Sequence, residues 1–410
     1  MKTENKLENR IHTVQEACEA LMALEVNPGT ERIPVEEACK RILAEDVTAQ
    51  IAVPSFEKSA FDGYAVRRED IEEASPENRI TLKVLETIAA GSVGRYSVTP
   101  GTASRIMTGA AIPDGADAVV KYEETEFSET EVTFSQPAKA PNIVAIGEDV
   151  KKGTCLSKQG KVISAADIAM MAGQGMEQVT VYKKPEIAVI STGSELLTPG
   201  QELVKGKIYN TNPYLLSGYM VANGMKPQKY GIVKDDIDAL KSCVEEALAQ
   251  SDMVITTGGV SVGDFDYIPR VMEQIGARIL FHRLAFKPGG AMLAAVKDGK
   301  VILGLSGNPG AAVVGMLRVG WPYMKKLCGM SEFCFAEAEA FLKDPYMRKS
   351  PGTRILRGKA QIIEGKLFFQ LIDNQRNGAV SSMADCNLLA EISAGSSELQ
   401  AGTKVKVYFI

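Results

Sequence analysis

The sequence predicts a multidomain α/β protein with one doubly wound domain, and three changes of pattern along its 410 residues support this fold class. Beyond Pro185, short apolar runs alternate with helical patterns, which indicates a mostly parallel sheet with helices on both faces. Between about residues 47 and 145 the helical periodicity disappears, and short alternating runs indicate a β-rich insertion. From Ser331 onward the pattern favours strands again. A chain of this length is expected to form about three separate cores.

Helical patterns are expected on both sides of the β-rich insertion. Thr13 begins a capping-box pattern, so the first helix should start there. A second helix is predicted over residues 35–44, and a strand of the insertion over residues 80–88. Ser164 should cap a further helix that stops at Gly173. The segments that flank the insertion could therefore form one discontinuous domain.

The doubly wound domain is expected to begin after the polar segment 182–185, whose proline breaks a strand. Asn212 should cap a helix with Pro213 in its first position. The other elements of this domain are expected at residues 187–190, 230–233, 237–249, 253–256, 267–275, 279–286, 301–305 and 311–327. Strands are then expected in a small terminal β-barrel or sandwich, over residues 354–363, 367–372 and 404–410.

The composition disfavours several classes of protein. A formal net charge of −5 argues against an extended surface for nucleic acid. No apolar run approaches the roughly 20 residues of a membrane span. The charged residues 1–10 lack a signal-peptide core, so we expect a cytoplasmic protein with no membrane partner. The seven cysteines are scattered, which indicates reduced thiols. The chain has only two histidines, which argues against a zinc hydrolase and against a Ser/His/Asp catalytic triad.

Three glycine-rich turns, each following an apolar run, predict an anion-binding site. They lie at residues 257–266, 287–290 and 306–310, and we expect all three at the carboxyl edge of the same sheet. Glycine accepts positive φ and lets a phosphate approach successive backbone N–H groups. Asp264 and Asp266 would repel such an anion unless a hard cation such as Mg²⁺ lies between. For the first turn, a plain strand-to-helix connection with capping aspartates is the alternative.

Further polar side chains are expected at the same edge. The segment 191–196 leaves a strand and should bring its hydroxyls and Glu195 there, although a helix cap is an equal alternative. Of Asp235 and Asp236, one should cap the following helix, which leaves the other free to face the site. Lys287 could supply a point charge to a phosphate or another oxyanion, or could be a solvated lysine at a turn.

Two segments of the insertion are also unusual. In residues 59–65, Asp62 and Gly63 locally favour a tight hairpin turn, and residues 105–110 have the pattern of a strand that enters a turn. Together with three segments of the doubly wound domain, they resemble the molybdopterin molybdenumtransferases of the MoeA type, which are related to the E domain of gephyrin. The motifs that carry the resemblance, in the family's order, are residues 59–65, 105–110, 191–196, 257–267 and 307–309. The resemblance replaces the hairpin interpretation of Asp62.

The resemblance implies a homodimer of four-domain subunits, with an α/β domain similar to the adenylyltransferase MogA. The domains would be a discontinuous elongated domain, a β-rich insertion, an α/β molybdopterin-binding domain and a C-terminal β-barrel, at residues 1–46 plus 145–182, 47–144, 183–330 and 331–410. The implied reaction inserts molybdate into adenylylated molybdopterin and releases AMP, with Mg²⁺ as cofactor. Molybdopterin adenylyltransferase is the implied upstream partner.

Matched onto the motifs, the family's functional positions fall on a defined set of residues. The implied catalytic residues are Asp62, Thr108, Glu195, Asp235, Asp266 and Lys287, and the implied metal ligands are Asp264 and Asp266. The implied cofactor-binding residues are Thr192, Gly193, Gly258, Gly259, Ser261, Gly263, Gly289, Ser306, Gly307, Asn308, Pro309, Arg357 and Ser381, with Ser382 as an alternative to Ser381. The resemblance also implies that Asp62 and Thr108 act in the site of the second subunit.

The sequence departs from the family on the side expected to hold the oxyanion. Many bacterial members read Lys-Pro-Gly-Lys-Pro where this chain has Gly290 after Gly289. Members usually read Pro-Gly-Asn-Pro-Val-Ser where this chain has Ser306, Gly310 and Ala311. These changes leave the oxyanion open between molybdate and tungstate. Two alternative functions also stay open. The chain could catalyse the preceding adenylyltransferase step, although its extra domains argue against this, or it could be a non-catalytic relative that binds a pterin or acts as a scaffold.

Overall fold

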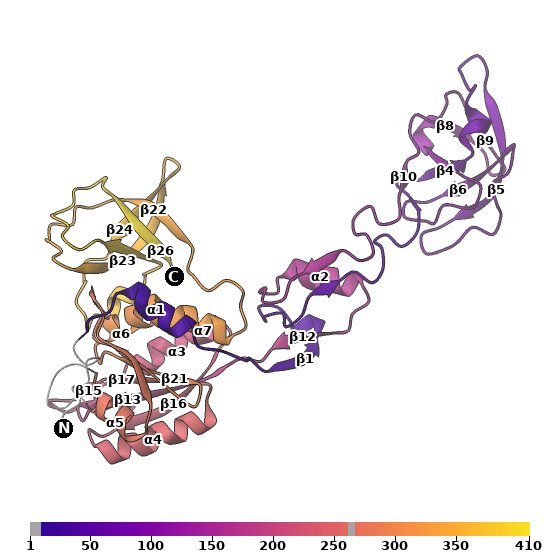
Figure 1. Cartoon of the computed structure of the whole chain (residues 1–410). Coiled ribbons are helices and arrows are strands. Elements are labelled where there is room, and N and C mark those ends of the chain that lie inside the picture. Colours follow the sequence, from indigo (N-terminus) through magenta and orange to yellow (C-terminus); the bar gives the residue numbers. More distant parts are fainter. Residues whose placement is uncertain (1–9, 261–266) are drawn as a thin grey trace. The chain divides into compact units, whose positions relative to one another are not determined.

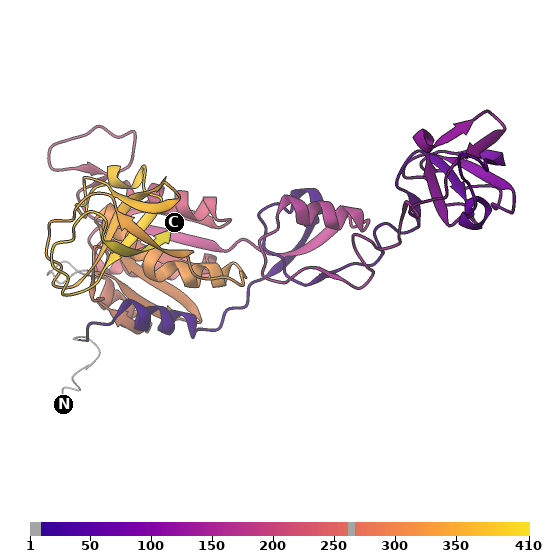
Figure 2. The same ribbon diagram turned by 90° about the horizontal axis from the view of Figure 1, so that it is seen from above.

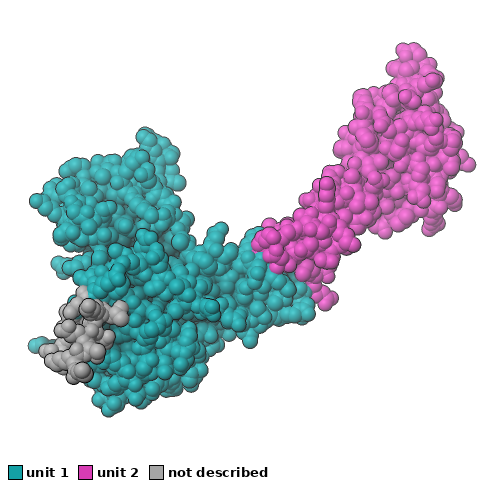
Figure 3. All heavy atoms as spheres, in the orientation of Figure 1, with its two compact units in different colours: residues 1–45, 159–164, 178–410 teal, residues 46–158, 165–177 magenta. Residues whose placement is uncertain are grey.

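The computed structural model describes residues 10–260 and 267–410, which pack as two compact units (Figures 1 and 3). The first unit takes in the chain up to Glu45, residues 159–164 and residues 178–410, and the second takes in residues 46–158 and 165–177. Each unit has a hydrophobic core of its own. The division of the chain into four domains stays a prediction.

A six-stranded sheet forms the centre of the first unit. Its order is β16 (Lys226–Val233), β13 (Glu186–Thr192), β17 (Met253–Thr257), β21 (Lys300–Leu305), β20 (Leu293–Lys297) and β18 (Arg278–His282). Five of these strands run in the same direction, and β20 alone runs antiparallel to its neighbours β21 and β18, which confirms the predicted mostly parallel sheet. Strand β20 was not predicted, although Asp298 and Gly299 form the two-residue positive-φ turn that favours a hairpin with β21.

Helices cover both faces of this sheet (Figures 1 and 2). On one face lie α4 (Ile237–Gln250) and α5 (Ile268–Gln274), and on the other lie α1 (Val14–Met22), α3 (Asn212–Ala222), α6 (Pro309–Gly315) and α7 (Trp321–Leu327). Successive residues of a strand point to opposite faces. Accordingly, Ile187 and Val189 of β13 belong to the core on the α1 side, whereas Ala188 and Ile190 belong to the core on the α4 side. The doubly wound architecture is confirmed.

The local sequence explains where several helices begin. Thr13 caps α1 as predicted, because its Oγ1 accepts a hydrogen bond from Glu16 N at 3.1 Å while Glu16 Oε2 accepts one from Thr13 N at 2.8 Å. Asp236 caps α4 by accepting from Ala239 N at 2.8 Å. Asn212 is the first residue of α3 rather than its cap. Within residues 10–260 and 267–410, no helix has the length and apolar content needed to span a membrane.

One predicted helix is wrong. Residues 35–44 contain only a short 3-10 turn at Val35–Glu37. Lys40 has a φ of 62°, which ends any helical path, and its backbone N donates to Ile163 O at 2.9 Å. The adjoining strand β1 (Thr30–Pro34) pairs with β12 (Gln178–Tyr182). Hydrogen bonds to distant segments therefore override the local helical pattern here.

The C-terminal part of the first unit is a closed barrel of five strands, which confirms the predicted barrel. The strand order is β23 (Thr353–Ile363), β24 (Lys366–Leu371), β22 (Glu337–Leu342), β26 (Lys404–Phe409) and β25 (Leu388–Ile392), and β25 pairs back with β23. The short strand β19 (Phe286–Lys287) pairs in parallel with the start of β23. Residues 286 and 287 therefore extend the sheet of the barrel and not the central sheet.

The second unit is built on another six-stranded sheet. Its order is β7 (Ala118–Lys121), β4 (Gly63–Val66), β6 (Thr102–Ile106), β5 (Ile80–Ile88), β9 (Glu131–Phe134) and β8 (Thr125–Phe127). The unit also contains α2 (Ala165–Gly173) and two short strand pairs, β3 (Lys58–Ser59) with β10 (Ile143–Val144) and β2 (Val47–Thr48) with β11 (Cys155–Ser157). Because β3 and β4 are not partners, the local hairpin interpretation of Asp62 is wrong.

Candidate functional site

The carboxyl ends of three neighbouring strands of the first unit, β13, β17 and β21, bring two of the predicted turns together. Gly258 N donates to Leu305 O at 3.0 Å, and Thr192 Oγ1 donates to Thr257 O at 3.3 Å. Gly258 has a φ of 96°, and a Cβ on it would lie 2.6 Å from Thr192 Oγ1. Only glycine allows the main chain to pass so close to the first strand end.

The turn after β21 lies against the turn after β17. A Cβ built on Gly307 would be 3.5 Å from Gly258 Cα, so the two backbones lie close together. The carbonyl of Gly307 accepts a hydrogen bond from Asn212 Nδ2 at 2.9 Å, and Ser306 Oγ accepts one from Asn308 N at 3.2 Å. Gly307 and Asn308 are exposed, so their backbone is accessible to a ligand.

Two carboxylates lie at the same strand ends. Asp235 follows β16, and its Oδ2 accepts hydrogen bonds from Ser194 N at 2.9 Å and from Ser194 Oγ at 2.7 Å. With Asp236 as the cap of α4, the two aspartates divide their roles as the sequence predicts. The exposed carboxylate of Glu195 folds over Gly193, with Oε2 2.6 Å from the position a Cβ would take there. This edge therefore combines exposed backbone with carboxylate oxygens.

The turn that contains Lys287 does not leave the central sheet, so the expectation that all three turns share one edge is wrong for this one. Lys287 lies in β19 opposite Arg354 of β23. Its side chain is exposed and lines a cavity of about 440 Å³ together with Arg354. The turn still reaches the central domain, because a Cβ on Gly289 would lie 2.8 Å from Gly315 N of α6. The cationic turn therefore packs against the helix that follows β21.

Arg357 connects the barrel to the start of the same helix. Its side chain is fully buried, with Nη1 donating to Ser382 Oγ at 2.7 Å and Nη2 donating to Arg376 O at 3.1 Å. A Cβ on Gly310 would lie 2.3 Å from Arg357 Nη1. Burial lowers the pKa of Arg357, and its Nε has no hydrogen-bond partner in the described part of the chain. The structure thus brings Ser382, and not the exposed Ser381, to the arginine.

In the second unit, Asp62 and Thr108 lie in direct contact. Asp62 Oδ1 accepts hydrogen bonds from Thr108 N at 2.6 Å and from Thr108 Oγ1 at 2.7 Å. These two donors, first the backbone amide and then the hydroxyl, lower the pKa of the Asp62 carboxyl, and the charge of Arg105 lowers it further. Asp62 is exposed and is ionised at neutral pH. A hydrogen bond from Tyr122 N to Asp62 O, at 3.3 Å, fixes its backbone.

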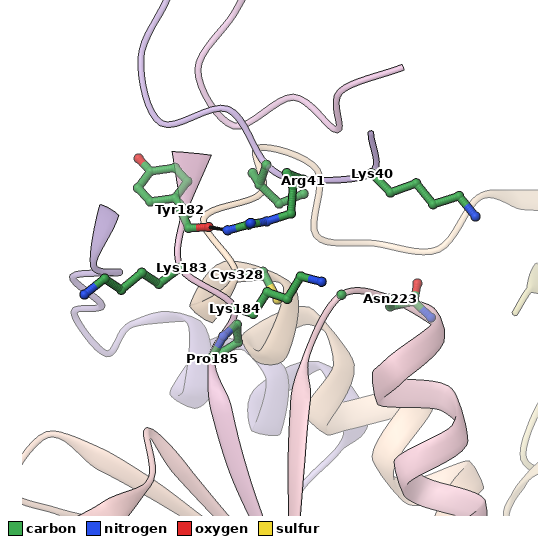
Figure 4. Close-up of a pocket in the computed structure, with 10 residues that line it drawn as sticks. Lys40, Arg41, Tyr182, Lys183, Lys184, Pro185, Asn223 and Cys328 are labelled. Atoms are coloured by element: carbon green, nitrogen blue, oxygen red, sulfur yellow. Dashed lines mark hydrogen bonds between the residues drawn. The ribbon is translucent and has the colours of Figure 1, made fainter. Parts of the chain in front are cut away.

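Four predicted residues, Ser261, Gly263, Asp264 and Asp266, lie outside the described residues. Within residues 10–260 and 267–410, no three His, Cys, Asp or Glu side chains gather as metal ligands would. A hollow at the opposite end of β13, lined by Lys40, Arg41 and Lys184, is shown in Figure 4. Its volume of about 10 Å³ barely holds one water molecule, so we exclude it as a ligand site.

Family comparisons agree with this arrangement. Residues 12–175 match the MoeA N-terminal region (domain I and II), residues 188–326 a probable molybdopterin binding domain, and residues 339–410 the MoeA C-terminal region (domain IV). A molybdopterin molybdenumtransferase of Staphylococcus aureus is 38% identical over 395 residues, or 96% of this chain and 94% of the relative. One of Staphylococcus epidermidis is 39% identical over 397 residues, with the same shares. The chain belongs to the molybdopterin molybdenumtransferase family.

Solved structures of the family have the same fold. A molybdopterin biosynthesis MoeA protein from Pyrococcus horikoshii is 31% identical, with 98% of this chain and 99% of that chain covered and a TM-score of 0.87. A second structure from that organism is 29% identical, with coverage of 98% and 100% and a TM-score of 0.82. Sequence reasoning did not single out Asn212 or Gly310 as site residues. The local pattern at Asn212 indicates only a helix cap, and the contact of Gly310 with Arg357 has no local signal.

Proposed function

We propose that this chain inserts molybdate into adenylylated molybdopterin and releases AMP. The observation that carries the proposal is the meeting of the β13, β17 and β21 ends, where the backbones of Gly258 and Gly307 lie close together beside two carboxylates. The substrate carries a pyrophosphate, and exposed backbone N–H groups next to glycine are suited to such a group. Membership of the molybdopterin molybdenumtransferase family supports the same reaction.

In this proposal the acidic residues act as anions with fixed positions. Ser194 donates two hydrogen bonds to Asp235 Oδ2, which fixes this carboxylate and leaves Oδ1 available as an acceptor. Asp62 is ionised and is held by Thr108, so it can accept a proton or orient a polar group but cannot serve as an acid at neutral pH. The exposed backbone at Gly307 would stabilise the charge that develops on the pyrophosphate as its bond to AMP breaks.

Mg²⁺ belongs to the proposal as the cation at this edge. The carboxylate oxygens of Glu195 and Asp235 are ligands of the kind that Mg²⁺ prefers, so the described donor set fits a hard cation. Asp264 and Asp266, assigned from the sequence, would complete its protein ligands. Bound there, Mg²⁺ would stabilise the negative charge of the pyrophosphate.

The oxyanion is proposed to bind near the contact between the barrel and α6. The side chain of Lys287 is exposed and its ammonium group makes no hydrogen bond or ion pair with any residue in the ranges 10–260 and 267–410, so its charge is available to molybdate. Arg357, with Ser382 rather than Ser381, is a further cationic group on this side and is buried. Tungstate matches molybdate in charge and nearly in size, so the choice between them is part of the test.

Other parts of the proposal rest on the family resemblance. We propose a homodimer in which Asp62 and Thr108 of one subunit serve the site of the other. Molybdopterin adenylyltransferase is proposed as the upstream enzyme, and the cytoplasm as the place of the reaction.

The test is AMP release from adenylylated molybdopterin with Mg²⁺, measured with molybdate, with tungstate and with no oxyanion. We expect release that depends on molybdate. Asp235→Asn should slow release by roughly tenfold or more, because a positioned charge is lost, whereas Asp238→Asn, on the exposed first turn of α4, should leave it unchanged. Substrate binding without oxyanion-dependent release would instead support a non-catalytic relative.

A further inference from the structure

Arg105, in the second unit, is a cation with a fixed position near Asp62 and Thr108, and the proposed reaction gives it no role. Its guanidinium stacks on two rings, with Cζ 5.0 Å from the Tyr122 centroid and 5.7 Å from the Phe127 centroid. Nε donates a hydrogen bond to Tyr122 Oη at 2.5 Å. A planar guanidinium stacked on rings and tethered through Nε has little rotational freedom left.

The rings that hold Arg105 form a rigid platform of their own. Tyr64, Tyr122 and Phe127 contact one another with centroid separations of 5.5, 5.8 and 5.6 Å. Tyr64 is fully buried, and it lies opposite Arg105 in the pairing of β4 with β6. Through Tyr64 the platform is anchored in the core of the second unit, Tyr122 packs against that core, and Phe127 lies at the surface.

Most of the hydrogen-bonding capacity of Arg105 is unused. An arginine has five N–H donors, and only the one on Nε finds a partner within the described ranges 10–260 and 267–410. The side chain is partly exposed, so its two terminal amino groups remain available to a ligand while Nε is held. Both terminal groups of a guanidinium can bind two oxygens of a phosphate at once.

The neighbouring carboxylate does not prevent an anion from binding here. Both hydrogen bonds from Thr108 go to Asp62 Oδ1, which disperses part of its charge. The charge of Arg105 also helps to stabilise the ionised carboxylate of Asp62, so the two opposite charges partly offset each other. Fixed donors beside an oriented carboxylate are suited to a phosphate that carries a hydroxyl-bearing sugar.

We propose that Arg105 binds a phosphate oxygen of the nucleotide part of the substrate, next to Asp62 and Thr108. This inference rests on the proposed function, because that function supplies an adenylylated substrate. Arg105 would then determine specificity for a phosphorylated nucleoside. The aromatic platform would act through the arginine as a positioning device.

The test compares the binding of AMP and adenosine to the full chain by calorimetry. Arg105→Gln should weaken AMP binding by about tenfold or more, the range for loss of a charge-assisted hydrogen bond, and should leave adenosine binding unchanged. Arg95→Gln is the matched control, because Arg95 is exposed in the same unit and its side chain has no partner within the described ranges. Tyr122→Phe keeps the ring but removes the acceptor for Nε, so an intermediate loss is expected.

Several outcomes would overturn the inference. Equal weakening of AMP and adenosine by Arg105→Gln would mean that the residue only supports the fold, and unchanged AMP binding would mean that it touches no phosphate. If the wild-type protein binds AMP no more tightly than adenosine, Arg105 likewise makes no contact with the phosphate. Loss of dimer without loss of AMP binding would assign Arg105 to an ion pair with a second copy. Arg105→Lys, which keeps the charge but not the fork, replaces Arg105→Gln if that variant does not fold.

The two proposals fail separately. If the wild type releases no AMP with either oxyanion, the proposed function is wrong. If it releases AMP and prefers AMP to adenosine, but Arg105→Gln changes neither affinity, only the role of Arg105 is wrong.

Discussion

Replacing Gly310 by alanine would test how the buried Arg357 is packed against α6. A Cβ at this position would lie 2.3 Å from Arg357 Nη1 and 2.8 Å from Asn377 O, so these neighbours must move. Arg357 has no exposed surface, and Ser382 and the carbonyl of Arg376 hold its two terminal nitrogens. The guanidinium therefore cannot retreat without losing a hydrogen bond.

We expect Gly310→Ala to lower the free energy of unfolding of the first unit by about 2 kcal/mol. Overpacking of a filled site costs roughly 1–3 kcal/mol, and a lost hydrogen bond to a charged group costs about 1.5–3 kcal/mol. The better helix propensity of alanine offsets up to about 1 kcal/mol. Gly218→Ala is the control, because Gly218 lies in α3 with nothing within 4 Å of its Cβ. That change should stabilise the unit by about 0.5–1 kcal/mol.

Urea unfolding followed by the fluorescence of Trp321 measures both effects. Trp321 is the chain's single tryptophan and is buried in the first unit, so its signal reports on that unit. In an Arg357→Met background the cost of Gly310→Ala should fall by about 1 kcal/mol, because the group it strikes is gone. If Gly310→Ala stabilises the unit as Gly218→Ala does, the reasoning about the Arg357 contact is refuted.

Three further predictions concern the electrostatics and stability of single groups. Thr108→Val should raise the pKa of Asp62, measured by carboxyl-carbon NMR, because the change removes one hydrogen-bond donor. Since the folded pKa is depressed, the stability that Asp62 contributes is present above its unfolded pKa and is lost as the pH falls through its folded pKa. An unchanged pKa would contradict the hydrogen bond from Thr108 to Asp62. Asp236→Ala should destabilise the first unit by about 1 kcal/mol through loss of the α4 cap, with Asp238→Ala as the control, and equal effects of the two would argue against capping. Burial raises the pKa of Cys328 to about 12 and that of Cys18 to about 11. Alkylation at pH 8, followed by mass spectrometry, should therefore label both thiols more slowly than the exposed Cys39 and Cys155. Equal labelling rates for all four would contradict this prediction.

The sequence predicts the central sheet well because each parallel strand is a short apolar run between helical patterns. Parallel order also predicts that residues after β13 and β17 share an edge, which is where the Thr192 hydroxyl meets the Thr257 carbonyl. The division of roles between Asp235 and Asp236 was predictable for a local reason, since a cap must directly precede its helix. Each of these features depends on short-range pattern.

Features that depend on distant pairing were not predictable. Residues 279–286 have the pattern of one strand, but Arg283 has a φ of 67°, so β18 ends before it and β19 joins the barrel. This break moves Lys287 from the central sheet to a strand opposite Arg354. Likewise, nothing near Lys40 in the sequence indicates its hydrogen bond to Ile163. A periodicity identifies a strand or helix, but it does not identify the partner.

The structure shows the surroundings of two residues at which the sequence departs from the family on the oxyanion side, Gly290 and Gly310. A Cβ at Gly290 would lie 2.2 Å from Phe286 O and 2.4 Å from Leu284 O, and Leu284 N donates to Gly290 O at 2.8 Å. This turn is wound so tightly that its backbone excludes a lysine at 290. Gly310, in turn, provides the space into which Arg357 packs. The cations on this side are therefore the exposed Lys287, Arg354 opposite it, and the buried Arg357, which Ser382 and Arg376 hold beside the start of α6.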